Sequence, residues 1–510
     1  MGIQVVWFKR DLRVHDHLPL REAAARGRVL PLYLFEPELW RQPDTSQRQW
    51  RFLRECLQEL DLEVGKLAGR RKGLVTRIGD AVQVLEQLHR QYGIDALWAH
   101  QETGNGWTFE RDKRVRRWAR RHGITFHEVP QDGVIRGLRE REGWREAWNA
   151  FVAQPPLPPP ARVELVEVPS ERLPTAVGED VCPYAQHGGR TRGLELLHTF
   201  LHTRVAGYLR GMSSPARAVR ACSRLSPHLA YGTLSLREVV HATRQRIAEL
   251  QEEGERTQPL VHALQAFESR LRWRSHFMQR LESLPSLEFV PMHPALASER
   301  TTLVPHLFEA WATGNTGYPF VDACMRMLRA TGWINFRMRA MLTAFACYHL
   351  WQPWREVGLH LARLYVDYEP GIHWSQVQMQ AGTTGISALR LYNVVKQSVE
   401  LDPQGRFIRQ WVPELRRVPA EWIHEPYRMP PSLQEEYGCR IGVDYPAPVV
   451  DHEMAARSAR QRLFAAYRSP EARAITEELL QRHTSRRPRE VRPSRTSRSQ
   501  LSLFTEGDTL

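Results

Sequence analysis

The chain of 510 residues has a formal net charge of +14, with 71 lysines and arginines against 57 aspartates and glutamates. This length is sufficient for two domains with separate cores, and 42% hydrophobic residues with 16 tryptophans argue against a disordered chain. The excess positive charge favours a polyanionic partner, although a ribosomal or membrane-surface protein would share it.

The six cysteines are scattered and contain no CxxC pair, so we expect reduced thiols in a cytoplasmic protein. No apolar run approaches the roughly 20 residues of a membrane span, and the chain enters a predicted strand with no signal peptide before it. Beyond Cys347 the sequence contains only Cys439, so we expect neither a four-cysteine iron–sulfur cluster nor another metal site.

Short apolar runs alternate with helical patterns over the first 150 residues. The predicted strands are Ile3–Phe8, Val29–Phe35, Leu74–Ile78, Ala96–His100 and Thr125–Val129, and Ala81–Tyr92 has helical spacing. This alternation predicts an α/β domain with a Rossmann-like parallel sheet over residues 1–150. No GxGxxG follows the first strand, so dinucleotide binding has no direct support there.

A proline run, Pro155–Pro160, begins a polar stretch that cannot continue a helix or a central strand. We therefore predict an interdomain linker over residues 151–189. The patterns that follow are almost all helical, which predicts a mostly α-helical domain over residues 190–468.

The segment Ile334–Leu350 is apolar almost all the way round, which predicts a helix buried on every side. It nevertheless carries Arg337 and Arg339. A buried guanidinium needs an anionic partner, and Asp367 and Glu369 are the candidates.

Long stretches of this region resemble a known family. The segments GNTGYPFVDACMRMLRATGW, WRE and RFIRQWVPELRRVPAEWIHEPY are similar to the flavin domain of DNA photolyases and cryptochromes, and VVWFKRDLRVHDHLPL extends the resemblance to the N-terminus. It implies non-covalent FAD in the helical domain. It also implies a possible second antenna chromophore, of folate or deazaflavin type, near Glu102, whose segment departs from the folate-binding pattern.

The resemblance further implies a cofactor cradle. Cys222–Ser226 is similar to the family's TSRLS, whose hydroxyls and amides suit a diphosphate, although such a segment alone is more often a helix cap. Arg339 with Asp367 would form the ion pair that stabilises reduced flavin. The implied cofactor-binding residues are Tyr208, Ser223, Arg224, Leu225, Ser226, Arg274, Trp333, Arg337, Arg339, Asp367 and Glu369.

On the lesion side the sequence departs from the family. Trp273 matches an aromatic residue that faces the substrate cavity, but Arg270, Phe336 and Ala340 stand where glutamate, asparagine and methionine are usual. Arginine at 270 could hold a phosphate or polarise a thymine carbonyl, but it cannot accept a proton. His373 lies where an asparagine faces the flavin in many relatives, and it could donate a proton or have a structural role.

The family's relay of three tryptophans for photoreduction is also altered. Trp354 matches the middle member, and the outermost falls on Thr301. The flavin-proximal member falls near Gln376, or on Trp374 if the loop is shorter. Trp351 could supply a different route, or these tryptophans could be core filler.

The C-terminal residues 469–510 form a predicted basic, disordered tail, in which Arg482–Arg498 contains seven arginines against one glutamate. Within it, QLSLF resembles the pentapeptide that binds the bacterial DNA sliding clamp. Gln500, Leu501, Leu503 and Phe504 would make the contacts, with the last two in an apolar pocket.

The resemblance implies one of two functions. The first is a deoxyribodipyrimidine photo-lyase, in which light-excited reduced FAD passes an electron to a pyrimidine dimer flipped out of UV-damaged DNA. We expect cyclobutane dimers as its lesion, with (6-4) products as the alternative. The second function is a cryptochrome-type blue-light photoreceptor, which the altered lesion side favours, whereas the charge and the tail favour repair.

Overall fold

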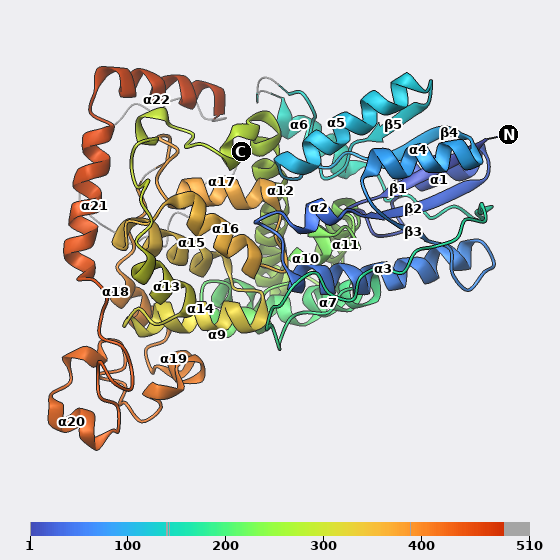
Figure 1. The fold of residues 1–510 in the computed structure, drawn as a ribbon. Coiled ribbons are helices and arrows are strands. Elements are labelled where there is room, and N and C mark those ends of the chain that lie inside the picture. Colours follow the sequence, from blue (N-terminus) through green and yellow to red (C-terminus); the bar gives the residue numbers. More distant parts are fainter. Residues whose placement is uncertain (1, 139–140, 142, 388, 484–510) are drawn as a thin grey trace.

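The computed structural model describes residues 2–138, 141, 143–387 and 389–483. Its N-terminal part is a five-stranded parallel sheet with the order β3-β2-β1-β4-β5 (Figure 1). The strands are β1 (Ile3–Phe8), β2 (Val29–Phe35), β3 (Val75–Ile78), β4 (Ile94–His100) and β5 (Thr125–Val129). The predicted α/β architecture is confirmed, with strand ends that differ from the prediction by two residues at most.

Helices cover both faces of this sheet. They are α1 (Leu18–Arg26), α2 (Pro37–Trp40), α3 (Gln47–Leu67), α4 (Ala81–Tyr92) and α5 (Gly106–Arg121), followed by α6 (Trp144–Ala153). Val6 and Phe8 share a buried cluster with α1 and α3, whereas Val5 and Trp7 share one with α4 and α5. Successive side chains of a strand point to opposite faces, so β1 is apolar throughout because both of its faces are buried.

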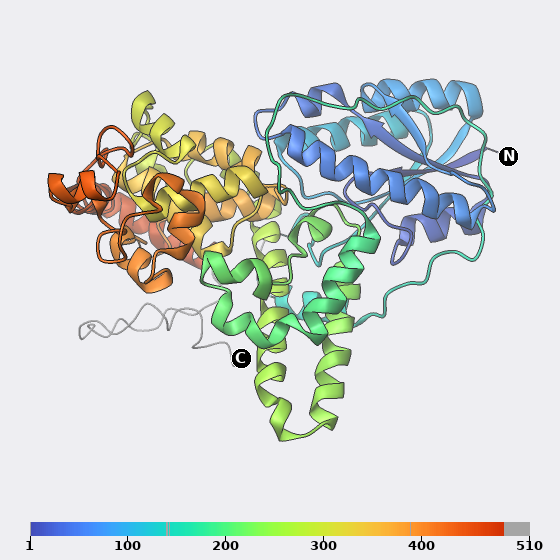
Figure 2. The ribbon, with the colours of Figure 1, turned by 90° about the horizontal axis from the view of Figure 1, so that it is seen from below.

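Residues 154–189 contain no helix or strand apart from one bridge between Val29 and Leu165. They run along the outside of the α/β part (Figure 2) and are attached to α3, where Arg48 Nη2 lies 2.6 Å from Asp180 Oδ1. The stretch therefore connects the two parts. The limits of 150, 189 and 468 that we assign to the domains stay a prediction.

The rest of the described chain is helical. Its α-helices are α7 (Arg190–His202), α8 (Tyr208–Gly211), α9 (Pro215–Ala221), α10 (Ser226–Ala230), α11 (Leu236–Glu252), α12 (Gln258–Ser283), α13 (Pro305–Thr313), α14 (Pro319–Thr331), α15 (Phe336–Ala344), α16 (Trp354–Leu364), α17 (Pro370–Gln380), α18 (Val394–Leu401), α19 (Arg406–Trp411), α20 (Pro431–Glu436), α21 (His452–Ala466) and α22 (Pro470–His483). One core lies among α14 to α19, and a second joins α6 to α7, α11 and α12.

Two predictions about this part are wrong in detail. The helix expected over Ile334–Leu350 is interrupted, because α15 ends at Ala344 and a π-helical turn, Phe345–His349, follows. The tail expected to be disordered from residue 469 begins with α22, because Leu479 packs against the cluster of Leu281, Leu287 and Met292.

None of the helices within the described residues is long and apolar enough to cross a lipid bilayer.

Candidate functional site

The predicted ion pair on α15 is present. Arg339 Nη1 and Nη2 donate to the two carboxylate oxygens of Asp367 at 3.0 and 2.8 Å, and Arg339 Nε donates to the Ile334 carbonyl at 2.8 Å. The guanidinium also lies 4.1 Å from the ring centre of Tyr365. Although desolvation opposes the charge, Asp367 and Tyr365 hold the pKa of Arg339 above its usual value, so the pair is fixed in its charged form.

Arg224 belongs to the same group of residues but has no carboxylate partner within ion-pair distance in the described part of the chain. Its guanidinium stacks on Trp333 at 4.0 Å from the ring centre, and Nη2 donates to Gln186 at 3.2 Å. Its buried Nε has no hydrogen-bond partner among the residues that the structure describes. Burial lowers the pKa of Arg224 to about 10, which marks a cation whose desolvation is not compensated by the protein.

The backbone of the predicted cradle is arranged by an arginine that the sequence analysis did not single out. Arg204 donates to the carbonyl oxygens of Cys222 and Ser223, the latter at 3.1 Å. Since the N–H and C=O of one peptide point in opposite directions, the amides of Ser223 and Arg224 face away from Arg204. Neither amide has an acceptor among the described residues, and Arg224 has a left-handed φ of 62°. Strained backbone of this kind is characteristic of binding sites.

Four further residues of the predicted cofactor site lie on α8, just before α10 or at its start. Ser223 Oγ lies 3.5 Å from the Leu225 amide, Leu225 is buried, and Ser226 begins α10. Tyr208 is buried beside Arg270, and desolvation raises its pKa.

The partner of Arg337 differs from the expectation that Asp367 or Glu369 neutralises it, because Glu369 is paired with Arg274. Glu369 is 3.4 Å from Arg274 Nη2, not paired with Arg337, and Arg274 Nη1 lies 2.8 Å from Asp132. Arg337 is instead 3.6 Å from Glu400, on α18. Arg337 and Arg339 are two positions apart on a helix, so their side chains point to different sides and cannot share one acidic pair.

These features fit FAD, for which the chain offers a cradle of unpaired donors. The orphaned Arg224 Nε and the two free amides are suited to the oxygens of a diphosphate. An open hollow of about 510 Å³ adjoins them and is lined by Arg204, Arg220 and Arg224 among other residues. Arg339 and Asp367 would lie beside the ring system that the family's cofactor carries.

On the lesion side, Trp273 is 37% exposed and stacks against Phe277 with ring centres 5.5 Å apart. Phe336 is 42% exposed at the start of α15, whereas Ala340 is buried. The structure therefore places two exposed aromatic residues, but not Ala340, at the surface of the helical part.

Two of the predicted relay tryptophans are in contact. Trp354 and Trp374 have ring centres 6.0 Å apart with perpendicular planes, and Trp374 is fully buried. Trp351 lies between Arg300 and Arg462, at 5.3 and 4.9 Å from their guanidinium carbons. Two adjacent cations oppose a positive charge on an oxidised indole, so the geometry favours Trp374 and Trp354 over Trp351 as a relay.

His373 is buried, and its Nε2 lies 2.9 Å from the Gly358 carbonyl. Burial lowers the pKa of this imidazole to about 4, so the ring is neutral near pH 7 and donates its N–H to the backbone. The geometry favours the structural role of His373 over proton donation.

The α/β part contains a different group of charges around Glu102. Arg111 donates to Glu36 at 2.8 Å and to Glu102 at 2.6 Å, and Lys9 donates to Asp112 at 2.9 Å. Glu102 is therefore buried and paired within the protein.

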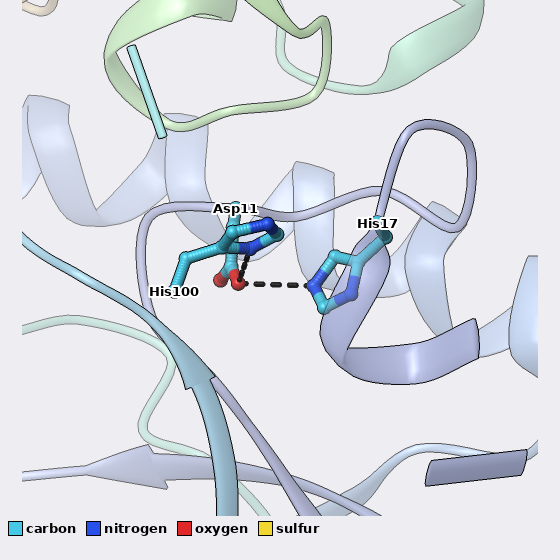
Figure 3. Close-up of side chains that lie close together, drawn as sticks. All are labelled: Asp11, His17 and His100. Atoms are coloured by element: carbon cyan, nitrogen blue, oxygen red, sulfur yellow. Dashed lines mark hydrogen bonds and ion pairs between the residues drawn. The ribbon is translucent and has the colours of Figure 1, made fainter. Parts of the chain in front are cut away.

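Asp11, His17 and His100 form a further buried cluster, in which one carboxylate oxygen accepts from both imidazoles at 2.9 and 2.8 Å (Figure 3). His17 Nδ1 accepts from the Leu20 amide, which leaves Nε2 as the donor. Burial lowers the pKa of both histidines more than any other effect, so both rings are neutral. The cluster fixes the loop that presents Arg10 to the carbonyls of Ala230 and Tyr368 in the helical part.

Two family models match the chain. The FAD binding domain of DNA photolyase matches residues 267–465, and the DNA photolyase model matches residues 4–137. A deoxyribodipyrimidine photo-lyase of Streptomyces griseus is 31% identical over 91% of this chain and 99% of its own length. A cryptochrome DASH of Gloeobacter violaceus is 29% identical over 88% of this chain and 93% of its own.

Solved structures give the same result. A bacterial class III photolyase from Agrobacterium tumefaciens superposes with a TM-score of 0.79 at 27% identity, covering 94% of this chain and 98% of that one. An archaeal photolyase from Sulfolobus tokodaii, which contains two FAD molecules and implies a novel light-harvesting cofactor, has a TM-score of 0.73 at 26% identity and covers 91% and 99%.

The fold and the matched domain define a flavoprotein, with an α/β part followed by a helical FAD-binding part. The chain belongs to the photolyase/cryptochrome family, and its relatives include both photolyases and cryptochromes.

Proposed function

We propose that this protein is an FAD-dependent, blue-light-driven DNA photolyase that repairs UV-induced pyrimidine dimers of the cyclobutane type. The full-length similarity to a deoxyribodipyrimidine photo-lyase supports repair, but cryptochromes are similarly related. The observation that carries the proposal is therefore the exposure of Trp273, because this side chain would contact the substrate and not the cofactor.

Trp273 lies on α12 within a basic stretch that contains Arg270, Arg272 and Arg274. An exposed tryptophan has an unfavourable apolar surface, and the half-buried Arg270 and Arg272 on the same helix can attract phosphates, whereas Arg274 is paired with Asp132 and Glu369. Aromatic side chains on which a base can stack, next to cations that hold the backbone, are typical of single-stranded or flipped-base binding. A sensor without a nucleic-acid substrate has no need of this combination.

FAD supplies the light-driven electron when it is bound. The chain's own residues would hold it: Arg224 and the amides of Ser223 and Arg224 would bind the diphosphate, and the guanidinium of Arg339, fixed by Asp367, would supply a positive charge to the ring system. Because Nη1 and Nη2 of Arg339 each donate to one carboxylate oxygen of Asp367, the guanidinium is held in one orientation.

Blue-light sensing is the second candidate, and it is favoured by Arg270. This residue replaces the expected lesion-binding glutamate, and it lies against the Tyr208 hydroxyl. A guanidinium in that position offers no acceptor for the bases of a lesion.

The test is repair of UV-irradiated oligonucleotides under blue light with a reductant, scored separately for cyclobutane dimers and (6-4) products. We expect the wild type to remove cyclobutane dimers. Trp273→Ala should lower the rate of this repair about 10-fold or more, since stacking contributes roughly 1–3 kcal/mol per base. Trp273→Phe is the matched control that keeps a stacking ring. If neither lesion disappears while the bound FAD is still photoreduced, the sensing function replaces repair.

Binding to the sliding clamp through Gln500, Leu501, Leu503 and Phe504 stays a prediction, since these residues lie outside those the structure describes. Deletion of residues 500–504 should abolish capture by the purified clamp and leave FAD content unchanged. Capture that persists after the deletion would disprove it.

A further inference from the structure

Beside Trp374 lies a tyrosine that neither the predicted relay nor the proposed cofactor site uses. The Trp374 indole N–H donates to the Tyr368 hydroxyl at 3.2 Å, and the Tyr368 hydroxyl donates to Asp44 Oδ2 at 2.7 Å. All three side chains are buried. They form a line that begins in the helical part, on α17, and ends in the α/β part, in the loop between α2 and α3.

Asp44 is equipped to receive a proton. Its Oδ2 accepts from Tyr368 and from Asn105 Nδ2, the latter at 2.9 Å, whereas its buried Oδ1 has no hydrogen-bond partner. No lysine or arginine lies within ion-pair distance of this carboxylate in the described part of the chain. Among the described residues Asp44 therefore offers the Tyr368 hydroxyl a carboxylate that is not neutralised by an ion pair.

We propose that Tyr368 and Asp44 form a proton-coupled electron donor to oxidised Trp374. Trp374 first loses one electron to a one-electron oxidant, the class of reagent that light-excited oxidised flavin provides in this family. Tyr368 then passes one electron to the Trp374 radical cation and its hydroxyl proton to Asp44 Oδ2. The products are neutral Trp374, a neutral tyrosyl radical on Tyr368 and a protonated Asp44.

The charges explain the direction of this step. Before it, a buried indole cation and a buried carboxylate lie on either side of the Tyr368 oxygen; after it, none of the three groups is charged. Removal of two charges from a low-dielectric interior is favourable. The indole cannot discharge itself instead, because its N–H points at the neutral phenol oxygen, which is a poor base.

The surroundings favour Tyr368 over other nearby tyrosines. Tyr365 is equally buried, and its ring centre lies 5.9 Å from that of His373. Its hydroxyl has no hydrogen-bond partner among the described residues, and its ring faces the Arg339 guanidinium. It therefore has no proton acceptor, and the adjacent cation opposes its oxidation. Tyr365 therefore serves as a control for Tyr368, because both are buried but only the Tyr368 hydroxyl has a proton acceptor among the described residues.

The experiment uses the FAD-loaded protein with oxidised flavin and no added reductant. After a blue flash, transient absorption follows the tryptophan radical, and electron paramagnetic resonance of freeze-trapped samples identifies the radical on the protein. We expect the tryptophan signal to decay into a tyrosyl signal that is lost in Tyr368→Phe and kept in Tyr365→Phe. In Asp44→Asn, whose amide cannot take up the proton, the decay should slow by about a hundredfold.

A second measurement needs no variant, so it holds even if a substitution prevents folding. In D2O the wild-type conversion should slow, since a proton moves with the electron. The proposal is overturned if the wild type forms only tryptophan radicals, if the tyrosyl signal survives in Tyr368→Phe, or if Asp44→Asn and D2O leave the decay unchanged. It rests on the FAD site, which repair and sensing share, so a failure of the repair assay does not affect it.

Discussion

The α/β part and the helical part each bury a group of charged side chains, and the two groups are balanced differently. In the α/β part, Lys9 and Arg111 face Glu36, Glu102 and Asp112, and each cation has a carboxylate within 2.9 Å. In the helical part, Arg339 is paired with Asp367, but Arg224 has stacking and one amide contact in place of a carboxylate.

The difference distinguishes a structural ion network from a binding site. A buried charge is costly unless it is paired, so a network that is complete within the chain needs nothing further. A buried cation without a carboxylate, beside two amides that have no acceptor among the described residues, fits a site at which another molecule supplies the anion. This contrast explains why we assign a ligand to the second group and not to the first.

The largest expected change in the free energy of unfolding comes from removing Arg111 from the buried ion network of the α/β part. Arg111→Met would leave Glu36, Glu102 and Asp112 with Lys9 alone, and removal of one partner from a buried ion network costs about 3–5 kcal/mol of unfolding free energy. Urea unfolding of the FAD-loaded protein measures this loss.

The control for this change is Arg41→Met, which removes an exposed pair with Glu38 and should cost less than about 1 kcal/mol. If Arg111→Met and Arg41→Met lose the same unfolding free energy, the buried α/β network contributes no more to stability than an exposed ion pair.

A smaller and opposite effect is expected in the helical part. Arg224→Gln removes a cation that the protein alone does not neutralise, so the unfolding free energy of the FAD-free protein should stay the same or rise. The Kd for FAD should increase by about 10- to 100-fold, because a hydrogen bond to a charged group contributes roughly 1.5–3 kcal/mol.

Titration of FAD-free protein with the cofactor measures this Kd, and Arg217→Gln, on the exposed side of α9, is the control. Removal of FAD should correspondingly lower the melting temperature of the wild type more than that of Arg224→Gln. If Arg224→Gln instead destabilises the FAD-free protein and binds FAD normally, Arg224 belongs to a structural network like that of Arg111.

The sequence predicted the sheet well, because a strand buried on both faces leaves few alternatives. The residues alone left Asp367 and Glu369 as partners for either Arg337 or Arg339, and the family resemblance implied the Arg339–Asp367 pair. The sequence failed where the partner comes from a distant element. Glu400 and Arg274 lie 63 and 95 residues from the groups they contact, Arg337 and Glu369. No spacing rule in a single sequence connects positions so far apart.

The missed features have the same origin. Arg204 acts through backbone carbonyls, which carry no sequence signal, and Asp44 meets Tyr368 only when the two parts of the chain are packed together. The helix α22 was missed for a different reason, since its few apolar residues, such as Leu479, are placed by contacts with residues 281–292 and not by a strong repeat of its own.

The smallest expected effect concerns Glu288, which is the acidic counterpart of Arg224. Glu288 is buried, accepts from the Gly106 amide at 2.7 Å, and has no cation within ion-pair distance among the described residues. Burial is the main cause that raises its pKa from 4.5 to about 7. The folded state therefore holds a proton between these two values that the unfolded state has released, so the free energy of unfolding falls as the pH rises through this window.

Glu288→Gln cannot lose that proton, and it should remove this part of the pH dependence. Relative to the wild type, its unfolding free energy should increase by about 2 kcal/mol between pH 5 and pH 8, as a shift of one pKa unit corresponds to 1.36 kcal/mol and partial solvation reduces the full value. Urea unfolding at both pH values measures the difference, and Glu436→Gln, at an exposed position, should show none. If the two variants behave alike, Glu288 is ionised in the folded protein. An unpaired buried carboxylate would then be tolerated here, and the absence of a partner would no longer suffice to assign a ligand to Arg224.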